Sequence, residues 1–152
     1  MAQEARLTMV LIDTKVWIDF FAAKYTPEVV ELERLLKEED ICTCGIILTE
    51  VLQGIREDLD YQRTLSRFDA FLFLPMNRPS FVRAAELYRS LRRRGVTIRK
   101  PVDCMIASVA IQHDIALLHN DRDFDPMEAH CGLKVVKVSK KPTKTPKRRP
   151  ED

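Results

Sequence analysis

The sequence predicts an α/β fold in which a mainly parallel central sheet is flanked by helices. Short, mostly apolar segments alternate along the chain with longer segments whose apolar residues recur at helical spacing. A chain of 152 residues that is 45% hydrophobic and 32% charged is long and apolar enough to bury one core. Since crossover helices cover both faces of a parallel sheet, strands that alternate with helices favour this architecture.

Five short segments have the apolar character of buried strands. The expected strands are Leu7–Ile12, Ile41–Cys42, Phe71–Leu74, Ala116–His119 and Leu133–Val138. The first of them, LTMVLI, is closed by Asp13.

Helical spacing of apolar residues, together with start and stop signals, predicts six helices. Pro27 and Pro101 each begin a helix, where proline is favoured, and Gly95 ends the longest one. The expected helices are Val16–Ala23, Glu28–Glu38, Ile46–Ile55, Leu59–Phe68, Ser80–Arg94 and Pro101–His113.

Charge divides the chain into a body and a tail. Residues 140–152 hold six of the 25 basic residues and two of the 23 acidic ones, which leaves a slightly acidic body. Prolines at three positions of the tail break any helix there. We therefore expect one folded domain over residues 1–138 and a flexible basic tail over residues 139–152.

Several classes of protein are disfavoured. No segment approaches the roughly 20 apolar residues of a membrane span, and the N-terminus lacks the features of a secretory signal. The four cysteines (Cys42, Cys44, Cys104 and Cys131) show neither disulfide-framework nor zinc spacing, which favours a reducing, cytoplasmic location. The chain also lacks a P-loop and a GxGxxG motif, so a nucleotide cofactor is not expected.

Acidic residues stand where a parallel sheet binds its ligands, beyond the carboxyl ends of the strands. Asp13 follows the first strand, and Asp121 follows the strand Ala116–His119. Each acid alone also fits a structural role: Asp13 as a helix cap, Asp103 as an acid at a helix start, and Asp121 and Asp123 as turn residues. Glu50 also fits an ordinary solvent-facing helix position.

Taken together, Asp13, Glu50, Asp103 and Asp121 suggest a metal site. Carboxylates that converge raise one another's pKa, and a divalent cation relieves their repulsion. Oxygen ligands without His or Cys select Mg²⁺ or Mn²⁺. A metal held in this way suits the hydrolysis of phosphodiester bonds.

Four segments carrying these acids resemble, in order and spacing, the signature segments of VapC-type toxins of the PIN-domain family. They are LIDTKVWIDFF at 11–21, LTEVLQGI at 48–55, PVDCMIASVA at 101–110 and LLHNDRDFD at 117–125. The resemblance spans about residues 7–138. It implies a PIN-like nuclease domain with Mg²⁺-dependent endoribonuclease activity, assembly as a homodimer, and inhibition by a cognate antitoxin protein.

By position, the resemblance makes Asp13, Glu50, Asp103 and Asp121 the catalytic and metal-binding acids, with Asp123 a possible fifth ligand. Lys15 departs from the family, which often has a small polar residue there.

Other polar residues receive supporting roles. Thr14 and Asn120 are candidates to support the ligands by hydrogen bonds. A basic cluster could contact the phosphates of RNA, with Arg92, Arg93 and Arg94 as the candidate contacts; its other members are Arg89, Arg99 and Lys100. The alternative function is a non-catalytic PIN-like module that binds RNA or protein; the presence of all four acids favours the enzyme.

Overall fold

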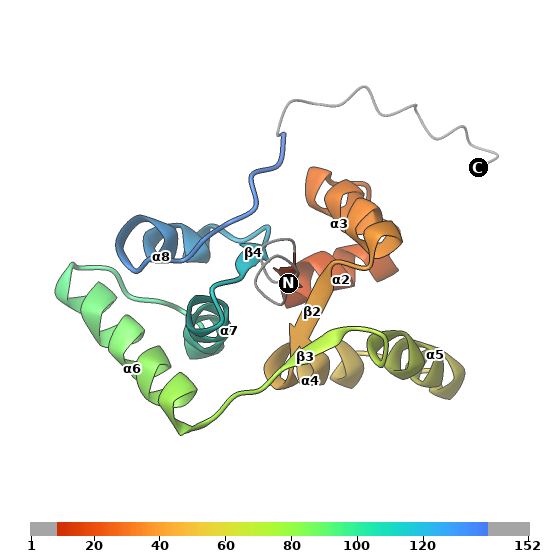
Figure 1. Ribbon diagram of the computed structural model, residues 1–152, viewed down its shortest axis with the longest axis horizontal. Helices are drawn as coiled ribbons and strands as arrows, with labels where there is room; N and C mark the ends of the chain where they lie inside the picture. Colours follow the sequence, from red (N-terminus) through yellow and green to blue (C-terminus); the bar gives the residue numbers. More distant parts are fainter. Residues whose placement is uncertain (1–8, 140–152) are drawn as a thin grey trace, which may run out of the picture.

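The computed structural model describes residues 9–139, and these form an α/β domain around a four-stranded parallel sheet (Figure 1). The strands are β1 (Val10–Ile12), β2 (Ile41–Cys44), β3 (Leu72–Leu74) and β4 (Ala116–Leu118), in the order β3-β2-β1-β4. The predicted fold class is therefore confirmed. The strands β1 and β4, far apart in sequence, are neighbours at the centre and one edge of the sheet.

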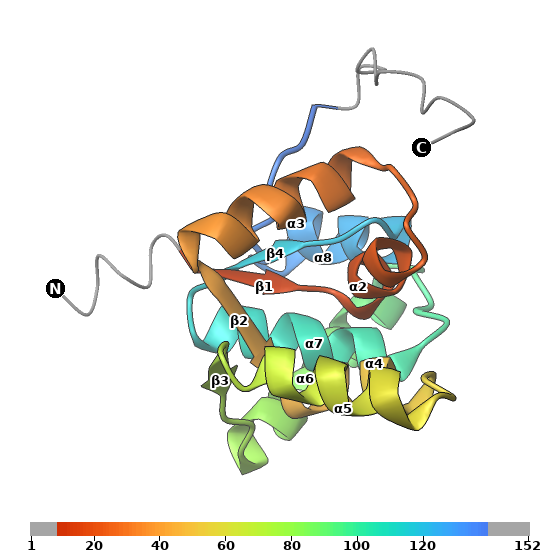
Figure 2. The same ribbon diagram turned by 90° about the vertical axis from the view of Figure 1, so that its right-hand side faces the viewer.

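Helices cover both faces of the sheet (Figure 2). In this view α3 lies above the strands, and α4, α5, α6 and α7 lie below them. Their bounds are α2 Thr14–Phe21, α3 Pro27–Glu38, α4 Gly45–Gln53, α5 Asp58–Phe68, α6 Arg78–Arg93, α7 Pro101–Gln112 and α8 Asp125–His130. The six predicted helices are present within two residues at each end, and Gly95, with a φ of 84°, follows the end of α6 as expected.

The expected last strand, Leu133–Val138, is the main error of the sequence-based fold. Within residues 9–139 this segment makes one isolated parallel bridge, between Val135 and Leu117, held by two backbone hydrogen bonds of 2.9 Å. Its neighbour β4 is only three residues long, so it has few backbone N–H and C=O groups with which another strand could pair. The segment therefore runs beside the sheet and touches it at one point.

A second difference is the region after β4, which the sequence suggested to be a turn. It forms a 3₁₀ turn, η1 (Arg122–Phe124), and the short helix α8. Only Met127 is buried on α8. A helix of six residues with one buried side chain has no apolar periodicity to reveal it.

Leu7 and Thr8 of the first predicted strand, and residues 140–152 of the predicted tail, lie outside the described residues. Within the part that is described, no helix is long and apolar enough to cross a membrane.

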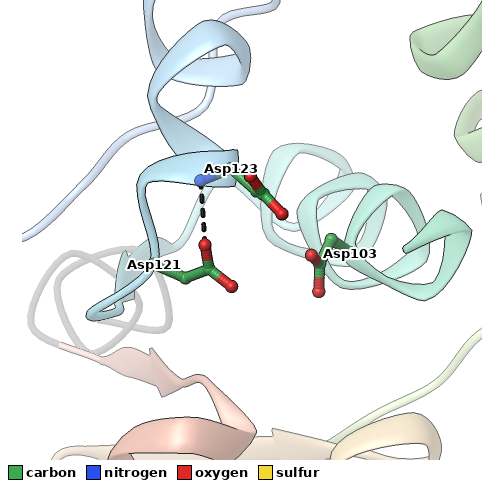
Figure 3. A group of neighbouring side chains, drawn as sticks. All are labelled: Asp103, Asp121 and Asp123. Carbon is green, nitrogen blue, oxygen red and sulfur yellow. Dashed lines mark hydrogen bonds between the residues drawn. The ribbon is translucent and has the colours of Figure 1, made fainter. Parts of the chain in front are cut away.

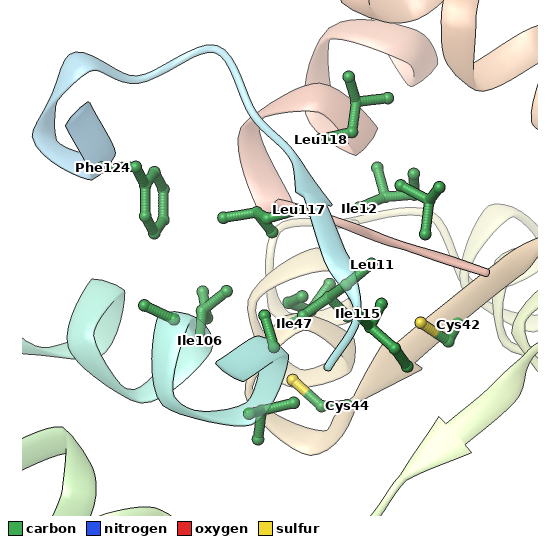
Figure 4. Packing of buried hydrophobic residues seen from close by; sticks show 14 of the residues in the cluster. Leu11, Ile12, Cys42, Cys44, Ile47, Ile106, Ile115, Leu117, Leu118 and Phe124 are labelled. Carbon is green, nitrogen blue, oxygen red and sulfur yellow. The ribbon is translucent and has the colours of Figure 1, made fainter. Parts of the chain in front are cut away.

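The core lies between the sheet and its helices (Figure 4). Leu11 and Ile12 of β1, and Leu117 and Leu118 of the neighbouring β4, are fully buried there. Burial of apolar side chains on this scale is the main term that holds the strands in register.

Three cysteines belong to this core, since Cys42, Cys44 and Cys104 are buried, and all four are free thiols. Burial raises the pKa of Cys42 to about 12 and that of Cys104 to about 11. These thiols therefore stay protonated at neutral pH and behave as small apolar side chains.

Candidate active site

The ends of β1 and β4 fix the positions of two acids. The register pairs Ile12 with Leu118, so the two strands end side by side. Asp13 follows β1 as the N-cap residue of α2, and its backbone N–H donates to the carbonyl of Leu118 over 2.9 Å. Asp121 follows β4 as the N-cap residue of η1. The sheet thus delivers both carboxylates to its carboxyl edge, as expected for this class of fold.

Three carboxylates meet closely at this edge (Figure 3). Asp103, Asp121 and Asp123 each offer an oxygen, and these oxygens all lie within 4.8 Å of one another. Asp103 comes from the first turn of α7, whereas the other two come from the loop and turn after β4. The backbone N–H of Asp123 donates to Asp121 Oδ1 over 2.9 Å and fixes that carboxylate. We call these three residues the acidic cluster.

Asp13 and Glu50 lie beside the acidic cluster without being part of it. Asp13 is buried, and the charges of Asp103 and Glu50 both act on it. Glu50, half-buried on α4, accepts a hydrogen bond of 2.8 Å from the Thr14 hydroxyl through Oε1. All five predicted acids therefore lie in one region, with three of them at the spacing of ligands to a shared ion.

The pKa values of these acids diverge. Burial, reinforced by the charge of Asp103, raises the pKa of Asp13 from 3.8 to about 7. Burial also raises the pKa of Asp103 to about 6, against the opposing effect of Lys100. For Asp121, burial is outweighed by the Asp123 N–H and by Lys100, so its pKa falls below the usual value. The site thus holds acids that resist ionisation beside one that ionises easily.

The donor set fits a hard divalent cation. Asp103 Oδ2 is buried and accepts no hydrogen bond from residues 9–139, and the Lys100 ammonium group lies 3.8 Å from it. Such an oxygen is costly to bury unless it is paired with a charge. Together with the close oxygens of Asp121 and Asp123, it forms an all-oxygen set of the kind that binds Mg²⁺ or Mn²⁺.

The remaining predicted residues divide into two groups. Thr14 contacts Glu50, as described above. Asn120 is half-buried, and Arg92, Arg93 and Arg94 are exposed around the end of α6. Within residues 9–139 no hydrogen bond or ion pair joins these four side chains to the acids.

Among the described residues, the cations that contact the acidic cluster are Arg99 and Lys100. The Arg99 guanidinium pairs with Asp123 at 3.2 Å, and Lys100 Nζ lies 3.1 Å from Asp121 Oδ2. The sequence analysis counted both in the basic cluster that could contact RNA but predicted no contact between them and the acids. The available signal was that Lys100 stands three residues before Asp103 at a helix start, where the two side chains face each other.

Comparison with known proteins identifies the family of this chain. The family model of the PIN domain matches residues 10–129. This chain belongs to the PIN-domain family. Its relatives include ribonuclease VapC11 of Mycobacterium tuberculosis, which is 39% identical over 127 residues, covering 77% of this chain and 90% of the relative. Ribonuclease VapC51 of the same organism is 31% identical over 101 residues, with coverage of 66% and 74%.

Solved structures with the same PIN-domain fold include VapBC2 from Rickettsia felis bound to a promoter DNA fragment. It aligns with a TM-score of 0.68 at 21% identity and covers 86% of this chain and 99% of its own. A toxin–antitoxin complex from Klebsiella pneumoniae aligns with a TM-score of 0.64 at 21% identity, with coverage of 84% and 96%. These likenesses agree with the α/β fold described above.

The raised pKa of Asp13 predicts how pH changes the stability of this PIN domain without metal. The folded protein keeps a proton on Asp13 between pH 3.8 and about 7, where the unfolded chain releases it. Its stability therefore falls as pH rises through this window. Asn cannot ionise, so replacing Asp13 by Asn removes the cost of holding a buried carboxylate at high pH. The free energy of unfolding should therefore rise by roughly 1–3 kcal/mol near pH 8, and by little near pH 4.

Urea unfolding in excess chelator at the two pH values measures this difference. Asp114→Asn, which changes an exposed carboxyl outside the site, is the matched control. The raised pKa of Asp13 would be contradicted if Asp13→Asn increased the free energy of unfolding equally at both pH values, or decreased it near pH 8.

Proposed function

We propose that this chain is a metal-dependent endoribonuclease of the VapC type that hydrolyses RNA phosphodiester bonds and serves as the toxin of a type II toxin–antitoxin pair. The observation that carries the proposal is the acidic cluster, with a buried Asp103 oxygen that accepts no hydrogen bond from residues 9–139, in a PIN domain that is 39% identical to a VapC ribonuclease. A module that only bound RNA or protein would gain nothing from burying carboxyls whose charged forms are costly.

The residues of the site divide into ligands and a base. Asp103 and Asp121, together with Asp13 and Asp123, are the side chains that would hold Mg²⁺ or Mn²⁺. When bound, the divalent cation lowers the pKa of a water molecule and stabilises the charge that grows on the phosphodiester. Glu50 is the proposed proton acceptor, because Thr14 orients its carboxylate through Oε1 and leaves Oε2 to receive a proton from the attacking water.

The raised pKa values of Asp13 and Asp103 support this division. Two buried carboxyls that resist ionisation in isolation ionise readily beside a divalent cation. Because metal binding must displace their protons, the apparent affinity for metal should increase with pH. The site is therefore best suited to activity at neutral or higher pH.

Replacing Asp103 by Asn tests the metal ligand directly. The change keeps the shape of the side chain and removes its charge, so metal-dependent cleavage of single-stranded RNA should fall by at least about a hundredfold. The fold should persist, since a neutral side chain relieves repulsion at a buried position. Cleavage is measured with purified protein free of antitoxin, with added Mg²⁺ and with excess chelator.

The control for this test is Asp114→Asn, which removes an exposed acid that pairs with Lys134 and should leave cleavage unchanged. Full activity of Asp103→Asn, or cleavage by the wild-type protein that persists in excess chelator, would refute the proposal.

We extend the proposal to a homodimer and to a cognate antitoxin protein as partner. The solved relatives named above include toxin–antitoxin complexes. An acidic site also attracts cations, so an antitoxin segment that bears Arg or Lys can compete there with metal or RNA. Neutralising the basic residues of that segment should weaken inhibition of cleavage by about tenfold or more. Inhibition that is unchanged by this neutralisation would show that the antitoxin does not act through basic residues at the acidic site.

A further inference from the structure

Two consecutive cations face the acidic cluster from the segment that leads into α7. Lys100, the N-cap residue of α7, places Nζ 3.1 Å from Asp121 Oδ2 and 3.8 Å from Asp103 Oδ2. Arg99 approaches the third acid, with its Nε and Nη2 atoms 3.2–3.4 Å from the oxygens of Asp123. Each member of the acidic cluster therefore has a cation from the chain itself.

Lys100 stands between two of the oxygens that the proposed metal requires. The ammonium group pairs with Asp103 Oδ2 and Asp121 Oδ2, and a divalent cation would bind the same two oxygens. Like charges so close together repel each other strongly, because the partly buried site screens them less than water does. The ammonium group and the metal therefore exclude each other from these oxygens.

We propose that Lys100 balances the acidic cluster before metal binds, is displaced by the metal, and then contacts a phosphate of the RNA. This inference rests on the proposed function, since it concerns the same metal and the same substrate.

The chemistry of lysine suits this exchange. The Lys100 side chain is 55% exposed, so its ion pairs contribute little and it is free to swing toward solvent. Its ammonium group is a point charge on a flexible stem, which binds phosphate without a fixed geometry. Arg99 is 74% exposed and keeps a forked contact with Asp123, so it is less suited to move.

The proposal has a consequence that a structural role for Lys100 would not share. Removing its charge should strengthen metal binding, because a competitor is lost, and should weaken RNA binding, because a phosphate contact is lost. If Lys100 merely held the acids in place, its removal would weaken both.

The experiment compares Lys100→Met with Lys134→Met, a matched control that removes another exposed lysine from its pair with Asp114. Calorimetric titration with Mn²⁺, without RNA, should give Lys100→Met a Kd lower than wild type by about two- to fivefold, with the difference shrinking as salt rises. Lys134→Met and the conservative Lys100→Arg should stay near wild type. In cleavage assays, Lys100→Met should raise the KM for a short single-stranded RNA severalfold and change kcat less.

Two results would overturn the inference: a Kd for Mn²⁺ in Lys100→Met that equals that of Lys134→Met, or one that is higher than wild type. Titration of Asp103→Asn separates this failure from a failure of the proposed function. If wild-type protein binds no Mn²⁺, or if Asp103→Asn binds it equally well, the metal site itself is wrong and both proposals fall.

Discussion

Crowding of carboxylates at the carboxyl edge of the sheet is the constraint on which the rest of the site depends. The β1–β4 register ends both strands at one place, and the hydrogen bond from the Asp13 N–H to the Leu118 carbonyl ties those ends together. Asp103 then enters from α7. Burial makes the charged forms of Asp13 and Asp103 costly, and the charge of Asp103 adds to the cost at Asp13. A cation is the simplest way to satisfy this arrangement.

Two effects can offset the cost of burying these carboxylates. Protons can neutralise Asp13 and Asp103, and Lys100 and Arg99 can pair with the acidic cluster. Both are reversible, because protons leave as pH rises and exposed ion pairs are weak. Reversible compensation of this kind is what the proposed metal site requires, because it can give way when a metal binds. This accounts for cations placed on the very segment that delivers Asp103.

The sequence was informative wherever one residue type has one strong structural consequence. Apolar runs located all four strands of the sheet, Pro27 and Pro101 marked helix starts, and Asp13 followed a strand end as predicted. It was uninformative where structure depends on contacts that are distant along the chain. The segment at Val135 looked like a strand because its composition is apolar, but the short edge of β4 decided how much of it could pair.

The same limit applies to the site. The acids were identifiable because their spacing resembles that of a family, and Thr14 was selected as a neighbour of Asp13. The pairing of Arg99 with Asp123 joins residues 24 positions apart, and no periodicity links them. Density of charge defined the basic cluster, but it did not show that Arg99 and Lys100, rather than the arginines at the end of α6, are the members that reach the acids.

The most direct test of the account is the position of a metal in a crystal of this protein grown or soaked with Mn²⁺. Anomalous scattering locates Mn²⁺ without reference to the acids. The account predicts a peak bound by Asp103 and Asp121, at distances of roughly 2.0–2.3 Å that suit a hard cation and oxygen, with Lys100 turned away from both. A crystal with saturating Mn²⁺ and no peak at these carboxylates, with Lys100 still paired to Asp121, would contradict it.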